Sequence, residues 1–257
     1  MELGIAGRTA VVCASTSGLG AATARALGAE GANVVVSGRR EELAKSIAAE
    51  LPSAVGVAVD LTADGGPEAL LAAATEAFGD IDILVLNGPG PKPLTASQLD
   101  PATTARAVHD LLFVQQELVN AVLPGMRARG WGRIVAIAST SVVQPLPNLA
   151  LSNVGRTALA AYLKSLATEV AADGVTVNLV LPGLIETDRI GVILGAAAQS
   201  SGRTEQELRA AEEQTVPARR FGRPEEFGAA AAFLCGASAS YITGTAVRVD
   251  GGLVRAL

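Results

Sequence analysis

The sequence predicts one α/β domain built on a doubly wound parallel sheet of about seven strands, with helices on both faces. Short runs rich in Val and Ile alternate along the 257 residues with longer, Ala-rich segments, which is the pattern of consecutive βαβ units. These strand candidates are near-continuous apolar runs, as in strands that are buried on both faces. Because no Pro- or Ser-rich linker divides the chain, we expect a single domain over residues 1–257.

The expected strands share a core of β-branched apolar residues, and they cover residues 9–13, 33–37, 55–59, 81–86, 133–138, 175–181 and 245–249. The segments between them are rich in strong helix formers such as Ala, Leu and Glu. Helices are expected over 18–30, 40–50, 67–78, 102–129, 151–172 and 224–235, with a helical insertion at about 188–215. Right-handed crossovers between parallel strands place these helices on both faces.

Composition and charge exclude several classes of function. The net charge is -5 and no basic cluster is present, which argues against nucleic acid as a partner. Cys13 and Cys235 lie far apart in apolar stretches, so free thiols in a reducing compartment are expected rather than a disulfide. One His and two Cys form no recognisable metal motif. No signal peptide or membrane-length apolar run is present, which predicts a cytoplasmic protein without membrane contact.

A Gly-rich loop connects the first expected strand to the first helix. Gly18 and Gly20 would let the backbone approach a pyrophosphate, and the helix N-terminus would offer free N–H groups and a positive dipole end. The position of this loop between strand and helix makes it a much stronger signal than a bare Gly-x-Gly. The residues expected to contact a dinucleotide here are Ser15, Thr16, Ser17, Gly18, Leu19 and Gly20.

The end of the second strand reads Gly38-Arg39-Arg40 and carries no acidic residue. A cofactor without a 2′-phosphate usually meets an acid there, which bonds to the ribose hydroxyls. Arg39 could instead bind a 2′-phosphate through two hydrogen bonds. The sequence therefore favours NADP(H) over NAD(H), with a solvated helix start as the alternative reading of both arginines.

Further motifs stand at regular positions: Asp60-Leu61 after the third strand, Asn87-Gly88-Pro89-Gly90 after the fourth, Pro182-Gly183 and Thr187 after the sixth, and Asp250-Gly251-Gly252 at the end. With the Gly-rich loop, they resemble the short-chain dehydrogenase/reductase (SDR) superfamily along nearly the whole chain. The resemblance implies a Rossmann-type fold and adenine contacts from Asp60 and Leu61. It also implies cofactor contacts from Asn87 and Gly88, and contacts beside the nicotinamide carboxamide from Pro182, Gly183 and Thr187. Cys13 and Ala14 replace the Thr and first Gly of the family's loop.

The chemical site departs from the family pattern, which uses Asn, Ser, Tyr and Lys. By spacing, these four positions are Leu111, Ser139, Ser152 and Arg156. Ser139 is the one residue of the four that is retained. The Ser152 hydroxyl is a far weaker acid than the phenol of the Tyr that it replaces, and Arg156, in the Lys position, effectively never deprotonates. Ser152 and Arg156 could still donate hydrogen bonds to developing negative charge, with Arg156 also beside the cofactor. Ser139, Ser152 and Arg156 are therefore the candidate catalytic residues.

Other interpretations of this region remain open. Ser152 could cap the helix that follows it, with Arg156 as a buried structural cation. Gln115 could share the face of Leu111, although a subunit contact is the favoured interpretation. The enoyl-reductase subtype uses a longer spacing between Tyr and Lys, and counting back seven residues from Arg156 gives Leu149, which does not support that subtype.

The insertion at 188–215 is where the family keeps its substrate lid. There Asp188 and Arg189 could meet the substrate, Arg189 through an anionic group, or the lid could simply hold internal salt bridges. By resemblance we expect a homo-oligomeric, NADP(H)-dependent oxidoreductase of a small carbonyl or hydroxyl compound, similar to a 3-oxoacyl reductase. A non-redox isomerase, lyase or dehydratase, or a non-catalytic cofactor sensor, would use the same scaffold.

Overall fold

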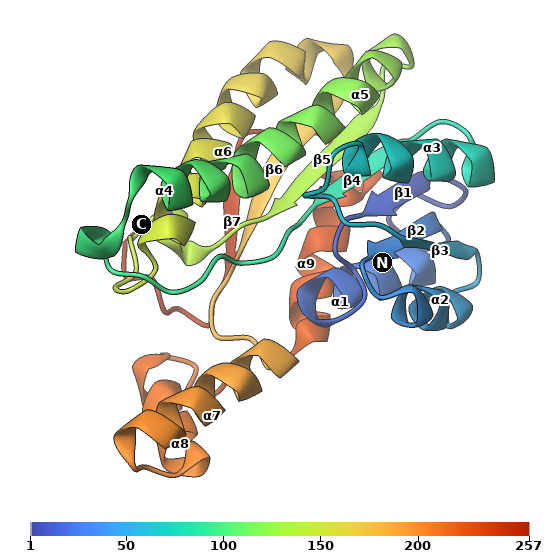
Figure 1. Cartoon of the computed structure of the whole chain (residues 1–257). Helices are drawn as coiled ribbons and strands as arrows, with labels where there is room; N and C mark the ends of the chain where they lie inside the picture. The colour runs from blue at the N-terminus through green and yellow to red at the C-terminus, as the bar shows by residue number, and fades with distance from the viewer. Residues whose placement is uncertain (1, 257) are drawn as a thin grey trace.

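The computed structural model describes residues 2–256 and contains one parallel sheet in the order β3-β2-β1-β4-β5-β6-β7 (Figure 1). The strands are β1 (Thr9–Val12), β2 (Asn33–Gly38), β3 (Ala54–Ala58), β4 (Ile83–Leu86), β5 (Gly132–Ile137), β6 (Val175–Pro182) and β7 (Ala246–Val249). All seven expected strands are present, with ends shifted by at most two residues. The Rossmann-type α/β fold is confirmed.

The strands form where both faces of the apolar runs can be buried. Every residue of β1, β4 and β5 is buried, whereas the edge strands β3 and β7 are partly exposed. One apolar core lies between the sheet and α3 (Gly66–Phe78), α5 (Val114–Ala128) and α6 (Ala150–Val170). A second core lies on the other face, and its helices are α1 (Gly18–Ala29), α2 (Glu41–Ala49) and α9 (Pro224–Cys235).

Small residues allow the helices of the second core to approach closely. A Cβ atom built on Gly228 of α9 would lie 2.5 Å from the Ala22 carbonyl oxygen of α1. Only glycine fits that crossing without a shift of backbone, which explains how Ala- and Gly-rich helices pack tightly here.

The helix predicted over 102–129 is confirmed, but it is not a regular α-helix throughout. The chain forms α4 (Pro101–Val108), a π-helical turn at His109–Phe113, and then α5. Leu111 lies in the π-helical turn and packs on α6, where a Cβ atom on Gly155 would lie 2.6 Å from the Leu111 Cδ1. The close contact between these segments is a tertiary feature that helical periodicity does not reveal. Turns of this kind are frequent at functional sites.

The insertion forms α7 (Asp188–Ser201) and α8 (Glu205–Thr215), which stand apart from the sheet in Figure 1. Gly202 ends α7 in the left-handed region, and Thr204 with Glu207 caps α8 reciprocally. Arg209 of α8 forms an ion pair with Glu186, just before α7. Among residues 2–256, no helix is both long and apolar enough to cross a membrane.

The sheet order positions the site. The chain builds β1, β2 and β3 outward, then returns to place β4 on the other side of β1. Ligands of open α/β sheets bind at the carboxyl ends of the strands, where the strand order reverses in this way. The segments that follow β1, β2, β4, β5 and β6 therefore meet at one edge.

Candidate active site

The Gly-rich loop after β1 forms a cradle for an anion. A Cβ atom on Gly20 would lie 2.5 Å from the Ala14 carbonyl oxygen and 2.8 Å from the Ser15 Cα, so only glycine fits. Ser17 precedes α1 and makes no side-chain cap hydrogen bond, which leaves N–H groups of the first turn available to a ligand. This geometry fits a phosphate group of a dinucleotide.

Ala14 adopts the left-handed conformation that favours glycine, with φ of 46°. The Asn87 side chain, from the end of β4, donates a hydrogen bond of 3.2 Å to the Ala14 carbonyl oxygen. Alanine is thus accommodated where the family has glycine, and Asn87 links the loops that follow β1 and β4.

The Ser15 hydroxyl does not face a ligand, contrary to its expected role as a donor to the cofactor. It donates to the Val12 carbonyl oxygen at 2.7 Å and accepts from the Ser37 N–H at 2.9 Å, and the residue is fully buried. These bonds connect β1 to β2, so the hydroxyl has a structural role.

Arg39 and Arg40 are both exposed at the carboxyl end of β2. Arg40 donates to the hydroxyls of Thr16 at 3.1 Å and Ser17 at 3.0 Å, which brings its guanidinium onto the Gly-rich loop. Arg40 was not among the expected cofactor residues, although its position next to Arg39 at a strand end was a usable signal. None of Gly38, Arg39 and Arg40 is acidic, and the first acidic residue after them is Glu41, which begins α2.

Asp60 lies beside this region, after β3. Its carboxylate accepts hydrogen bonds from the Thr62 N–H and hydroxyl at 3.0 and 2.8 Å, and these bonds, with the charge of Arg39 adding, hold the pKa of Asp60 below its usual value. The neighbouring Leu61 is buried in the core. Asp60 is therefore an anion near Arg39 at neutral pH.

The Gln115 side chain points into the protein, so the interpretation that it forms a subunit contact is wrong. The residue is 3% exposed. A Cβ atom on Gly88 would lie 3.5 Å from the Gln115 Nε2. Within the described part of the chain, the Gln115 Oε1 is buried without a hydrogen-bond partner. A buried acceptor without a partner beside the loop after β4 has the character of a site residue.

Ser152 and Arg156 meet one turn apart on α6. The Arg156 Nε donates to the Ser152 Oγ at 3.3 Å, and its Nη1 donates to the Ile137 carbonyl oxygen at the end of β5, at 3.0 Å. Burial, with the charge of Arg189 adding, lowers the pKa of Arg156 to about 10. The guanidinium thus remains a cation at neutral pH.

The interpretation of Ser152 as a helix cap is wrong. Helix α6 begins at Ala150, with Leu149 preceding it, so Ser152 lies inside the first turn. Ser139 follows β5, and its Oγ accepts a hydrogen bond of 3.1 Å from the Ser141 N–H. The Ser139 hydroxyl keeps its own proton available for donation.

The segment after β6 lies over the Gly-rich loop. A Cβ atom on Gly18 would lie 3.5 Å from the Thr187 methyl group, and one on Gly183 would lie 2.6 Å from the Asp250 Cα. Arg189, in the first turn of α7, reaches the loop after β4, where its Nη1 would lie 2.2 Å from a Cβ atom on Gly90. The structure therefore brings parts of the predicted site together from distant segments.

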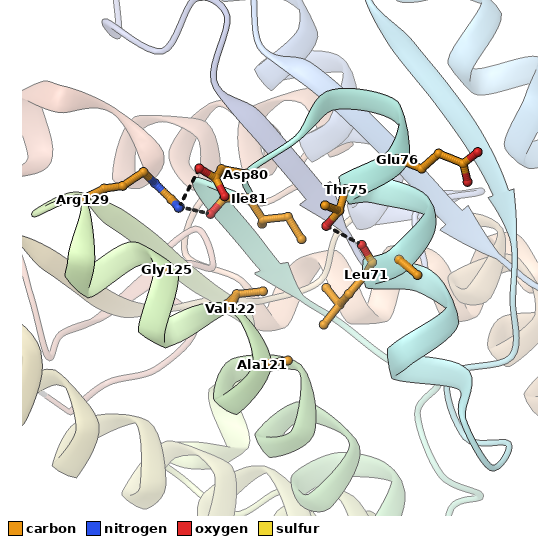
Figure 2. Close-up of a pocket in the computed structure, with 10 residues that line it drawn as sticks. Leu71, Thr75, Glu76, Asp80, Ile81, Ala121, Val122, Gly125 and Arg129 are labelled. Atoms are coloured by element: carbon orange, nitrogen blue, oxygen red, sulfur yellow. Dashed lines mark hydrogen bonds and ion pairs between the residues drawn. The ribbon is translucent and has the colours of Figure 1, made fainter.

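A separate hollow lies between α3 and α5 (Figure 2). Asp80 and Arg129 form an ion pair of 3.2 Å there, and Arg129 also donates to the Ile81 carbonyl oxygen. Ile81 precedes β4, so this hollow is at the amino end of the sheet. None of the predicted site residues line it.

Comparisons with known proteins agree with this geometry. The family model described as enoyl-(acyl carrier protein) reductase matches residues 13–254. The chain is 36% identical over 256 residues to rabbit (Oryctolagus cuniculus) dehydrogenase/reductase SDR family member 4, covering 96% of this chain and 94% of the relative. It is 34% identical over 254 residues to the 3-oxoacyl-(acyl-carrier-protein) reductase of Vibrio cholerae, covering 98% and 99%.

Among solved structures, L-sorbose reductase from Gluconobacter frateurii, complexed with NADPH and L-sorbose, superposes with a TM-score of 0.93. The two chains are 33% identical, and the match covers 100% of both. The similarity therefore extends over the whole sheet and the insertion.

Proposed function

The chain belongs to the short-chain dehydrogenase/reductase superfamily and is an oxidoreductase, and from this premise we propose that it reduces a small carbonyl compound with NADPH through an atypical site. The observation that carries the proposal is the convergence of two parts at one sheet edge. The glycine cradle before α1 fits a phosphate, and the Ser152–Arg156 pair is anchored at the end of β5.

The preference for NADP(H) is supported by the charges at the end of β2. Arg39 and Arg40 supply two exposed guanidinium groups there, and Arg40 already contacts the Gly-rich loop. A guanidinium binds a phosphate bidentately, which a ribose hydroxyl cannot match. Asp60 would be left to contact the adenine side, and Thr187 and Asn87 the nicotinamide side.

The bound nicotinamide would supply the hydride, and the side chains would stabilise the carbonyl oxygen. Arg156 remains charged at neutral pH and would donate a charge-assisted hydrogen bond to the developing oxyanion. The Ser139 and Ser152 hydroxyls would add neutral donors. Because Arg156 does not release its proton readily, the proton that reaches the oxygen would come from water. Loss of a general acid costs on the order of 10²–10⁴ in rate, so an activated carbonyl is the best-matched substrate.

The proposal also covers the oligomeric state of the protein, its location in the cell and the role of its helical insertion. Phe113 and Val154 expose apolar surface on the π-helical turn and on α6, at 48% and 42%. These positions support pairing of subunits through the long helices into a dimer or tetramer. We place the protein in the cytoplasm, with residues 1–257 as one domain and residues 188–215 as its substrate lid.

Titration of the purified protein with NADPH and NADH, followed by energy transfer from Trp131, tests the cofactor. Saturable NADPH binding with a clear preference over NADH is expected, together with NADPH oxidation in a screen of carbonyl compounds. No saturable binding of either cofactor would overturn the oxidoreductase mechanism. Product formation without change in the cofactor's redox state would indicate a non-redox enzyme, and binding without any turnover would indicate a sensor.

A further inference from the structure

We infer that the substrate of this site carries a carboxylate, which Arg189 binds at the mouth of the site while the carbonyl oxygen lies at Ser152 and Arg156. The inference rests on the proposed function, since it names the class of carbonyl compound, short oxo acids or the matching hydroxy acids. It assigns Arg189 as a residue that determines specificity.

Arg189 is an exposed residue whose guanidinium lies close to the backbone of the loop after β4. Its guanidinium lies over Gly90, where an added Cβ atom would fall 2.2 Å from Nη1, 2.5 Å from Nη2 and 2.7 Å from Cζ. Glycine at position 90 thus makes room for an arginine that comes from α7, about a hundred residues along the chain. The first turn of α7 is thereby brought close to the loop that follows β4.

Arg156 reaches the same edge of the sheet from the next strand. Its Nη1 is bonded to the carbonyl oxygen of Ile137, at the end of β5, and β5 pairs with β4 through Leu86 and Ala136. Two cations therefore stand over neighbouring strand ends. Their mutual repulsion contributes, after burial, to the lowered pKa of Arg156.

Neither cation is neutralised within residues 2–256. Arg189 and Arg156 form no ion pair there, in contrast to Arg209 with Glu186 and Arg220 with Glu226. The adjacent Asp188 is exposed and makes no ion pair with Arg189. An arginine in the first turn of a helix also faces the positive end of the helix dipole. A bound anion would offset both the repulsion between Arg189 and Arg156 and the repulsion between Arg189 and the positive end of the α7 dipole.

A carboxylate of the substrate fits this position better than a phosphate of the cofactor. The phosphates already have the α1 N-terminus, Arg39 and Arg40 on the side of β1 and β2. Arg189 lies against the loop after β4, and Arg156 holds Ser152, where the carbonyl is proposed to react. A planar guanidinium binds a carboxylate through two parallel hydrogen bonds.

Calorimetric titration of the enzyme saturated with NADP⁺ tests the inference, since oxo compounds cannot be reduced by the oxidised cofactor. The probes are three acids, each with its neutral methyl ester: pyruvate, acetoacetate and levulinate. At least one acid should bind about 10- to 100-fold more tightly than its ester. Arg189→Met should abolish that difference and leave the affinity for the ester and for NADP⁺ unchanged.

Two control variants sharpen the result. Arg203→Met removes an exposed lid cation whose side chain bonds to the Glu207 carbonyl oxygen, and it should behave as the unmodified protein. Arg189→Lys keeps the charge and should restore part of the preference for the acid, which a general loss of folding would not.

Three results would overturn the inference. The first is that no acid in the panel binds more tightly than its ester. The second is that the preference for the acid survives in Arg189→Met. The third is that this variant weakens NADP⁺ binding by the same factor as it weakens binding of the acid, which would assign Arg189 to the cofactor. Because this binding assay needs no turnover, it remains decisive if the screen finds no carbonyl that oxidises NADPH. That failure would count against the proposed function alone.

Discussion

The two halves of the site are built from different materials. The cradle after β1 consists of backbone: the Ala14 carbonyl oxygen leaves no room for a Cβ atom on Gly20, and the N–H groups come from α1. The chemical half consists of side chains from α6 and α7, namely Ser152, Arg156 and Arg189. A backbone cradle tolerates few changes and serves one ligand chemistry, whereas a side-chain site can change its reaction while the scaffold stays the same.

The largest expected effect is on the chemical half. Arg156→Ala should lower kcat/KM for the best carbonyl substrate by about 10²–10³, because it removes a charged donor to the oxyanion. The affinity for NADPH, measured by fluorescence titration, should change far less. Lys164→Ala removes another cation of α6, one that bonds to the Gly244 carbonyl oxygen, and should leave kcat/KM unchanged. A loss confined to NADPH affinity would show that Arg156 serves the cradle instead.

Adding a methyl group at Gly20 tests whether the backbone after β1 forms the phosphate cradle. Gly20→Ala places a Cβ atom against the Ala14 carbonyl oxygen, so we expect the free energy of unfolding to fall by about 1–3 kcal/mol and NADPH affinity to fall with it. Gly191→Ala in α7 is the matched control, because its Cβ atom would meet nothing within 4 Å. Urea denaturation should show the control to be equal or more stable. Equal losses in both variants would contradict the cradle.

Arg39 and Arg40, at the end of β2, are expected to set the preference for NADPH over NADH. Arg39→Ala should weaken NADPH binding by about 10- to 100-fold, the effect of one charge-assisted contact to phosphate. NADH binding should stay the same, so the ratio of the two dissociation constants is the readout. Arg40→Ala should weaken both cofactors, since Arg40 also positions Thr16 and Ser17. An unchanged ratio in Arg39→Ala would return Arg39 to a solvated helix start.

The smallest expected effect is a gain. Ala14 occupies the left-handed region at a cost of roughly 1 kcal/mol, which glycine would avoid. Since glycine also loses more entropy on folding, Ala14→Gly should raise the free energy of unfolding by up to about 1 kcal/mol. Ala72→Gly, at an exposed position inside α3, should lower it by about 1 kcal/mol. A drop in both variants would show that Ala14 is not strained.

The fold was predictable because its signals are local. Apolar runs such as Val34–Val36 indicate a strand wherever they occur, and Pro67 and Pro224 mark helix starts from the sequence alone. The π-helical turn inside the long helix could not be predicted, because it accompanies a contact between Leu111 and Gly155, more than forty residues away.

The site was predictable in its positions and less so in its roles. Ser152 and Arg156 are one turn apart on a helix, so their contact follows from spacing. The Ser15 hydroxyl was assigned to the cofactor, yet it bonds to Val12 and Ser37 because β2 lies beside β1. Arg40 was overlooked for the same reason, since its partners Thr16 and Ser17 lie on the loop after β1.

The sequence by itself determined the strands, the helices, the glycine cradle and the superfamily, since each depends on the spacing of residues along a short segment. Only the tertiary structure decided that Gln115 is buried with an unpaired oxygen, that Arg40 lies on the Gly-rich loop, and that Arg189 reaches Gly90. These contacts join residues from separate crossovers of the sheet. The sheet order sets which strand ends are neighbours, and no local pattern of residues encodes which of the segments that follow the strands lie close together.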